Sequence, residues 1–185
     1  MPGTLVRGLV LVGGLTVASA APAGDPVNLL ANAGFEQEAA WTCSGAASLR
    51  NRWNNHDGGR YNAALLGTWA TQGTEGVIEQ GGIPVTAGVA YRASAWVYKD
   101  LGWHPMAQWL RVAFYDREGR VLKEHRTEFE VPNKREWQEV VGLALAPSNA
   151  VTASVGLGAH GISPFGALTI DDLSFSEVRS IGKKE

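Results

Sequence analysis

The stretch Leu168-Thr-Ile-Asp-Asp-Leu-Ser-Phe175, near the end of the chain, has the alternation of a half-buried β-strand. Its four apolar residues recur on one side, with a slip in the period at Asp171-Asp172. Adjacent carboxylates in such a strand repel each other unless a positive charge lies beside them, and the strand holds no Lys or Arg. A bound cation is therefore predicted here, and Ca²⁺ suits carboxylate and carbonyl ligands best.

A partner stretch, Asn28-Leu-Leu-Ala-Asn-Ala-Gly-Phe-Glu36, lies near the start of the chain. Leu29-Leu30 begin a strand, and Asn32-Ala-Gly34 forms a turn. The last two residues place an aromatic ring beside a carboxylate, that of Glu36. The two ends of the chain are predicted to lie together.

Taken in order with two intermediate phrases, these stretches resemble the cellulose- and xylan-binding carbohydrate-binding modules of families four, nine and twenty-two. The intermediate phrases are Gly81-Gly-Ile-Pro-Val-Thr-Ala-Gly-Val-Ala-Tyr91-Arg-Ala-Ser-Ala-Trp-Val97 and Arg135-Glu-Trp137. The resemblance covers nearly the whole chain after its first 20 residues. It implies a galactose-binding-like β-jelly roll that binds sugar on a concave sheet face walled by loops.

The resemblance also implies a structural Ca²⁺ that bridges the two ends of the chain. Glu36 is carried over as a ligand from the Gly-Phe-Glu phrase, together with one aspartate of Asp171-Asp172. Backbone carbonyls near Ala33 and in the 48–52 region would complete the shell. The residues alone leave an alternative open, in which Glu36 binds backbone amides and the aspartate pair caps a bulge.

The composition predicts one globular domain. The chain has 185 residues, of which 45% are hydrophobic, and a formal net charge of −2. This charge argues against nucleic acid or an anionic membrane as a partner, because both attract basic surfaces. The single cysteine, Cys43, cannot form an internal disulfide and is predicted to be a small buried hydrophobe. We expect a monomer.

The first 20 residues have the pattern of a secretory signal peptide. Arg7 supplies the positive charge, an apolar run follows, and Ala18-Ser-Ala20 offers a cleavage site. The protein is therefore predicted to be secreted or periplasmic. The predicted division of the chain is a signal peptide at 1–20, a tether at 21–27, the jelly roll at 28–178 and a tail at 179–185.

The remaining sequence consists of short strand-like segments between turns, without a convincing amphipathic helix. The predicted strands are Leu29-Leu30, Phe35–Trp41, Ala46–Asn51, Ala63–Thr68, Val77–Val85, Ala90–Lys99, Gln108–Asp116, Val121–Glu130, Glu136–Leu145, Thr152–Leu157 and Leu168–Ser176. This spacing is typical of an all-β, antiparallel sandwich of the jelly-roll type.

Two of these segments, Ala90–Lys99 and Gln108–Asp116, predict a sugar-binding face. In each, alternate apolar residues form one side, which we expect to face the core. If the two segments pair as neighbours, one outer face gathers aromatic rings and arginines, which suit the C–H faces and hydroxyls of a sugar. The predicted face residues are Trp96, Tyr98, Trp109, Tyr115, Arg92 and Arg111.

Further aromatic residues lie in the predicted loops. The candidates for the walls of the site are Trp53, Trp103 and His104. The simpler interpretation is that several rings cap the core or pack beneath loops. Trp137, Trp41 and Trp69 are assigned to the core, and the four histidines show no metal-ligand spacing.

Two alternatives to non-catalytic polysaccharide or oligosaccharide binding remain. A polysaccharide lyase or glycoside hydrolase would need two carboxyl groups with divergent pKa values across a cleft. The available acid pairs are Glu75 with Glu79, Glu124 with Glu128, and Asp116 with Glu118, and nothing in the sequence selects one. A structural or adhesion module that binds protein would instead favour a broad apolar patch.

Overall fold

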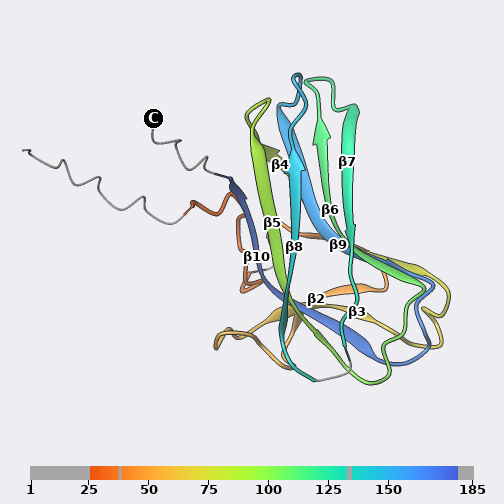
Figure 1. The fold of residues 1–185 in the computed structure, drawn as a ribbon. Coiled ribbons are helices and arrows are strands. Elements are labelled where there is room, and N and C mark those ends of the chain that lie inside the picture. Colours follow the sequence, from red (N-terminus) through yellow and green to blue (C-terminus); the bar gives the residue numbers. More distant parts are fainter. Residues whose placement is uncertain (1–25, 38, 133–134, 179–185) are drawn as a thin grey trace, which may run out of the picture.

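Ten antiparallel strands form two stacked five-stranded sheets, seen in a computed structural model that describes residues 26–37, 39–132 and 135–178 (Figure 1). This confirms the predicted all-β sandwich. No helix among the described residues is long and apolar enough to cross a membrane. The predicted signal peptide at 1–20 and tail at 179–185 lie outside the described residues.

The strand order in each sheet departs from the order along the chain. The first sheet runs β1 (Thr42–Gly45), β4 (Glu75–Pro84), β9 (Thr152–His160), β6 (Ala107–Tyr115) and β7 (Val121–Glu128). The second sheet runs β2 (Ala47–Asn51), β3 (Asn62–Leu66), β10 (Ala167–Glu177), β5 (Ala90–Lys99) and β8 (Gln138–Leu145). The strands that carry the two predicted binding segments, β5 and β6, thus belong to different sheets.

The alternation predicted for β5 and β6 is confirmed. Tyr91, Ala93, Ala95 and Val97 of β5 and Leu110, Val112 and Phe114 of β6 all lie in the core between the sheets. Hydrophobic burial on these inner faces fixes the side that each strand presents outward.

The predicted pairing of β5 with β6 is wrong. β5 pairs with β10 and β8, whereas β6 pairs with β9 and β7. The physical reason lies in the segment that connects them, because the ring of Trp103 enters the core there and is 0% exposed. The chain therefore passes from one sheet to the other at this point instead of turning back as a hairpin.

The two ends of the described chain meet as predicted. The backbone N–H of Leu29 donates to the carbonyl of Phe175 at 2.8 Å, and the side chain of Asn28 bonds the backbone of Leu173 and Phe175. The slip at the acidic pair is a β-bulge, since the β10–β5 register shifts between Asp171 and Ser174.

Several local predictions are wrong. The described residues of the segment Phe35–Trp41 form no strand; the rings at its two ends pack together in the core at 4.8 Å between centroids. The strand β1 follows directly and was missed. Because β1 is an edge strand, Cys43 is exposed and not buried. Trp41 is in the core as predicted, whereas Trp69 is 71% exposed and packs against Phe165.

Candidate functional site

The outer face of the first sheet has a strip of small residues along its central strand, β9. Ser154, Gly156 and Gly158 alternate there with the core residues of the same strand. The strip lets large side chains of β6 lie across it. A Cβ atom on Gly158 would be 2.7 Å from the ring of Trp109, and the hydroxyl of Tyr115 lies 3.1 Å from Oγ of Ser154.

Arg111 lies between these two rings and bridges three strands. Its guanidinium group reaches past the bare Gly156 to Glu79 on β4, at 2.9 Å, and also donates to Glu124 on β7 at 2.9 Å. Glu124 in turn accepts from Nε of Arg126 at 2.5 Å. The guanidinium group of Arg126 lies over the ring of Trp109, 4.5 Å from its centroid.

These side chains form one continuous surface, which we call the β6 platform. Its members are Trp109, Arg111, Tyr115, Glu79, Glu124 and Arg126. Burial alone would raise the pKa of Glu124, but hydrogen bonds from Arg111 and Arg126 outweigh it and lower the pKa. The platform therefore offers fixed charged donors and acceptors beside aromatic rings.

The other half of the predicted face lies on the opposite side of the sandwich. Trp96, Tyr98 and Arg92 point outward from β5 in the second sheet, where Arg92 pairs with Glu139 at 2.7 Å. The prediction of a single face with all six residues is therefore wrong, because their strands are in different sheets.

The rings on the second sheet are partly covered. The imidazole of His56, from the β2–β3 loop, stacks on Trp96 with 4.3 Å between ring centroids. Trp137 packs against both His56 and Tyr98. The assignment of Trp137 to the core is wrong, since it is half-buried on this outer face. Trp96 consequently has one ring face occupied by the protein itself.

The three loop residues predicted to wall the site differ in exposure. Trp103 is buried and cannot wall a site; its Nε1 donates to the side-chain oxygen of Gln108 at 2.9 Å. Trp53, in the β2–β3 loop, is 60% exposed. His104 is exposed and lies 3.0 Å from the carbonyl of Leu101.

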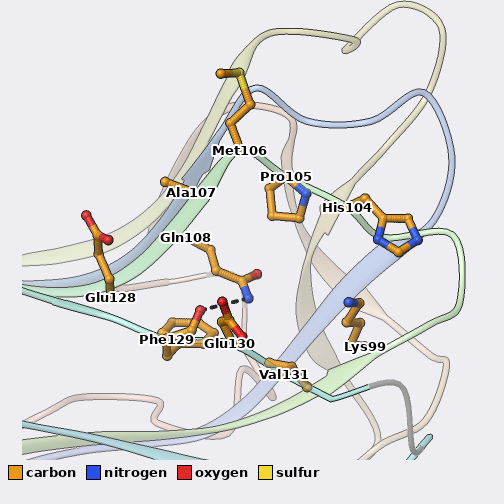
Figure 2. Close-up of a pocket in the computed structure, with 10 residues that line it drawn as sticks. All are labelled: Lys99, His104, Pro105, Met106, Ala107, Gln108, Glu128, Phe129, Glu130 and Val131. Carbon is orange, nitrogen blue, oxygen red and sulfur yellow. Dashed lines mark hydrogen bonds between the residues drawn. The ribbon is translucent and has the colours of Figure 1, made fainter.

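A pocket of about 430 Å³ lies where the β5–β6 connection meets the end of β7 (Figure 2). Its lining includes His104 and three charged side chains, those of Lys99, Glu128 and Glu130. Glu128 lies opposite Trp109 in the β6–β7 register, so the pocket adjoins one end of the β6 platform. The side chain of Gln108 bonds the carbonyl of Phe129 across its floor.

The acidic pair of β10 lies beneath the β2–β3 loop. Asp171 is 1% exposed and accepts the backbone N–H groups of His56 and Asp172, at 3.0 and 2.9 Å. Burial, together with the neighbouring carboxylate of Asp172, raises the pKa of Asp171 to about 6, against the opposing effect of these hydrogen bonds. A Cβ atom on Gly34 would lie 3.3 Å from Oδ1 of Asp172 and 3.9 Å from Oδ1 of Asp171.

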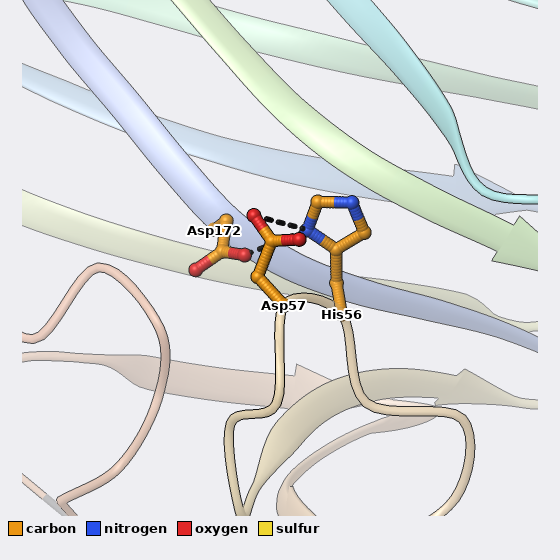
Figure 3. A group of neighbouring side chains, drawn as sticks. All are labelled: His56, Asp57 and Asp172. Carbon is orange, nitrogen blue, oxygen red and sulfur yellow. Dashed lines mark hydrogen bonds and ion pairs between the residues drawn. The ribbon is translucent and has the colours of Figure 1, made fainter.

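The sequence did not reveal which residue approaches this acidic pair. Nδ1 of His56 lies 2.8 Å from Oδ2 of Asp172 and 3.6 Å from Oδ2 of Asp57, and the three potential ligand atoms lie within 4.8 Å of one another (Figure 3). The histidines have no metal-ligand spacing in the sequence, but the fold brings His56 beside two carboxylates. Its only sequence signal was its place in a polar loop, because the contact joins residues 116 positions apart.

The other two predicted ligands have protein partners. Oε1 of Glu36 accepts the backbone N–H groups of Arg60 and Tyr61, at 2.7 and 3.0 Å. The carbonyl of Ala33 accepts the N–H of Leu173 at 3.1 Å. Glu36 thus anchors the β2–β3 loop, as in the amide-binding alternative left open by the sequence.

Comparison with known proteins gives matches among solved structures alone. No family model and no curated protein matches the chain. The xylan-binding CBM22-1 domain of Paenibacillus barcinonensis Xyn10C has a TM-score of 0.62 at 15% identity, over 84% of this chain and 97% of that one. TmCBM61, solved with β-1,4-galactotriose, has a TM-score of 0.53 at 18% identity, over 82% and 99%.

Larger proteins contain the same fold. The enzymatically active domain of bacteriophage CBA120 tailspike protein 4 has a TM-score of 0.63 at 16% identity, over 82% of this chain. The match spans 21% of that tailspike chain. Together with the two stacked sheets described above, these similarities show that the chain has the β-jelly-roll fold that these carbohydrate-binding modules share.

Proposed function

We propose that this protein is a secreted, monomeric and non-catalytic carbohydrate-binding module that binds a β-linked polysaccharide through the β6 platform. The observation that supports it most is the bridge of Arg111 to Glu79 and Glu124 across the bare strip of β9. The solved structures that share the fold include domains described as xylan-binding or bound to β-1,4-galactotriose. The predicted signal peptide supports export.

The platform matches the chemistry of a sugar chain. Hydroxyl groups need donors and acceptors in fixed positions, and the ion pairs hold Arg111, Glu79 and Glu124 in place. Aromatic rings favour the apolar C–H faces of sugars. Tyr115 supplies such a ring, whereas Trp109 is 4% exposed and supports Arg126 from below. Trp109 is therefore proposed to position a donor instead of stacking on sugar itself.

The charge state of the platform favours binding over hydrolysis or elimination. A general acid in a glycosidase needs a carboxyl group with a raised pKa. The arginines lower the pKa of Glu124. Hydrogen bonds donated by the backbone N–H and side chain of Arg120, and by the backbone N–H of Glu118, lower the pKa of Asp116. Among the described residues, the carboxyl group whose pKa is raised is that of Asp171, and it is buried beneath a loop.

Replacing Arg111 with glutamine is expected to weaken polysaccharide binding roughly tenfold, because charge-assisted hydrogen bonds are lost. The matched control is Arg92→Gln, which also breaks one outward arginine–glutamate pair but on the opposite sheet. Binding is measured by affinity electrophoresis against a panel of soluble neutral polysaccharides. Affinity within twofold of wild type is expected for Arg92→Gln.

The proposal would be refuted if Arg111→Gln binds as wild type does, or if both arginine variants lose affinity equally. Thermal unfolding of both variants separates a loss of binding from a loss of fold. Loss confined to Arg92→Gln would place the sugar site on the second sheet, beside Trp96 and Tyr98.

We also propose a structural Ca²⁺ at the acidic pair of β10. The donor set fits in part: Oδ1 atoms of Asp171 and Asp172 both approach Gly34, and Ca²⁺ prefers oxygen ligands. The carbonyl of Ala33, bonded to Leu173, is a third candidate. Glu36 and Asp171 each accept two backbone amides, so both are candidates on the same terms. The ion would offset the charge repulsion between the aspartates.

Removal of the ion with EDTA is expected to lower the melting temperature by several degrees. A ligand that binds only the folded state adds about 2.7 kcal/mol when present at 100 times its Kd. Differential scanning calorimetry with EDTA, and again after excess Ca²⁺, measures the effect. Asp172→Asn should respond less to either addition, and an unchanged melting temperature in wild type would exclude the site.

A further inference from the structure

Three arginines surround one tyrosine where the β2–β3 loop enters β3. The guanidinium carbons of Arg50, Arg52 and Arg60 lie 4.5, 5.3 and 5.5 Å from the ring centroid of Tyr61. Arg50 and Arg52 also donate to the phenol oxygen, at 3.0 and 3.2 Å. Tyr61 itself is 7% exposed, whereas the three arginines are exposed.

Two members of the cluster, Arg52 and Arg60, carry positive charge that no described carboxylate pairs with. Within the described residues, neither Arg52 nor Arg60 forms an ion pair, and the nearby carboxylate of Glu36 is bonded to backbone amides. Like charges held this close repel one another, and cation–π contacts with one ring offset this only in part. An anion between the guanidinium groups would remove the repulsion.

The backbone is bent at the arginines as well. The β2–β3 register shifts between Ser48 and Asn51, and Arg50 lies in this bulge with φ of 58°. A left-handed conformation is unfavourable for a long side chain and concentrates at functional positions. Bulges commonly redirect a side chain next to a binding site.

We infer that Arg52 and Arg60, beside Arg50 at the ring of Tyr61, form a second binding site, which takes the anionic groups of an acidic polysaccharide: sulfate esters or uronate carboxylates. Guanidinium forks match such oxygens through paired hydrogen bonds. Trp53 follows Arg52 directly and is 60% exposed, which supplies an aromatic ring beside the charges, as a sugar requires. This inference goes beyond the neutral-sugar site on the β6 platform and does not depend on it.

The formal charge of −2 for the chain argues against polyanions in general, but binding depends on the local charge. The β6 platform lies on the first sheet, whereas the arginine cluster lies at the end of β2 and in the loop that joins it to β3, both strands of the second sheet. The two sites can therefore be tested separately.

The test compares each anionic polymer with a neutral counterpart of the same backbone. Dextran sulfate is paired with dextran, and polygalacturonate with its methyl ester, in affinity electrophoresis at low ionic strength. Wild type is expected to bind at least one anionic member roughly tenfold more tightly than its neutral counterpart. The variant Arg52→Gln/Arg60→Gln should lose this preference, and its binding should depend less steeply on salt.

The control variant, Arg117→Gln/Lys123→Gln, removes the same charge from exposed positions on and beside β7. It should keep the preference for the anionic polymer. Tyr61→Phe, which keeps the ring but loses the phenol acceptor, should weaken the preference less than the double arginine variant does.

Three results would overturn the inference. They are equal binding of anionic and neutral polymers by wild type, equal losses in the arginine and control variants, and equal affinity for duplex DNA. The last result would indicate general polyanion attraction. The β6 platform is tested separately with neutral polysaccharides. If Arg52→Gln/Arg60→Gln still binds them and Arg111→Gln does not, the platform binds sugar whether or not the arginine cluster binds anions.

Discussion

Trp103→Ala is expected to lower the free energy of unfolding by about 3–5 kcal/mol. The ring is the largest fully buried side chain among the described residues, and its indole N–H bonds Gln108. Its removal leaves a cavity at the crossing between the sheets, and it also leaves the amide oxygen of Gln108 without a partner. The sequence made Trp103 a candidate for a sugar contact. Loss of a buried ring should lower stability, whereas loss of a sugar-contacting ring should lower binding.

Chemical denaturation of Trp103→Ala and Trp53→Ala separates these roles. Trp53 is 60% exposed, and its replacement should change stability by no more than about 0.5 kcal/mol. Trp103→Ala should retain neutral-polysaccharide affinity at temperatures where it remains folded. Wild-type stability in Trp103→Ala, combined with lost sugar binding, would contradict the buried position.

In EDTA, wild type is expected to lose about 2 kcal/mol of stability relative to Asp171→Asn as the pH rises from about 4 to about 7. The pKa of Asp171 is about 6 in the folded protein, against 3.8 as the ordinary value. Between these values the folded state holds a proton that the unfolded state has lost. Stability from this group is therefore full below pH 3.8 and is lost as the pH rises through 6.

The variant isolates this effect, because an amide at position 171 does not titrate. The variant also loses one acceptor for the N–H groups of His56 and Asp172, but that cost is independent of pH. Unfolding free energies of both proteins across this pH range measure the difference. A difference that stays flat in EDTA would show that Asp171 is not desolvated, and added Ca²⁺ should abolish the loss at neutral pH.

The sequence predicted each face of β5 and β6 correctly, since alternation is a local property with a period of two residues. Tyr91 and Phe114 lie in the core for this reason. The pairing of these strands depends on where the segment around Trp103 goes, which alternation does not specify. The outward residues of each strand were therefore predicted correctly, but the single surface predicted from them does not exist, because β5 and β6 belong to different sheets.

At the acidic pair of β10, the sequence again predicted local features but not contacts between distant segments. The bulge at Asp171-Asp172 and its closeness to the chain start could be predicted from the period and the order of phrases. The approach of His56 could not, because it depends on how the β2–β3 loop folds over β10. The binding roles of the β6 platform residues and the Ca²⁺ site stay predictions until the variants above are measured.

The strip of small residues on β9 has a consequence for how the outer face of the first sheet can change in evolution. The side chains of the β6 platform come from β4, β6 and β7 and point away from the core, so selection can exchange them without repacking the interior. Gly156 is constrained differently, because a Cβ atom there would lie 2.2 Å from the carbonyl oxygen of Ile78. The strands on either side of β9 can therefore change the chemistry of this outer face while β9 itself keeps its small residues.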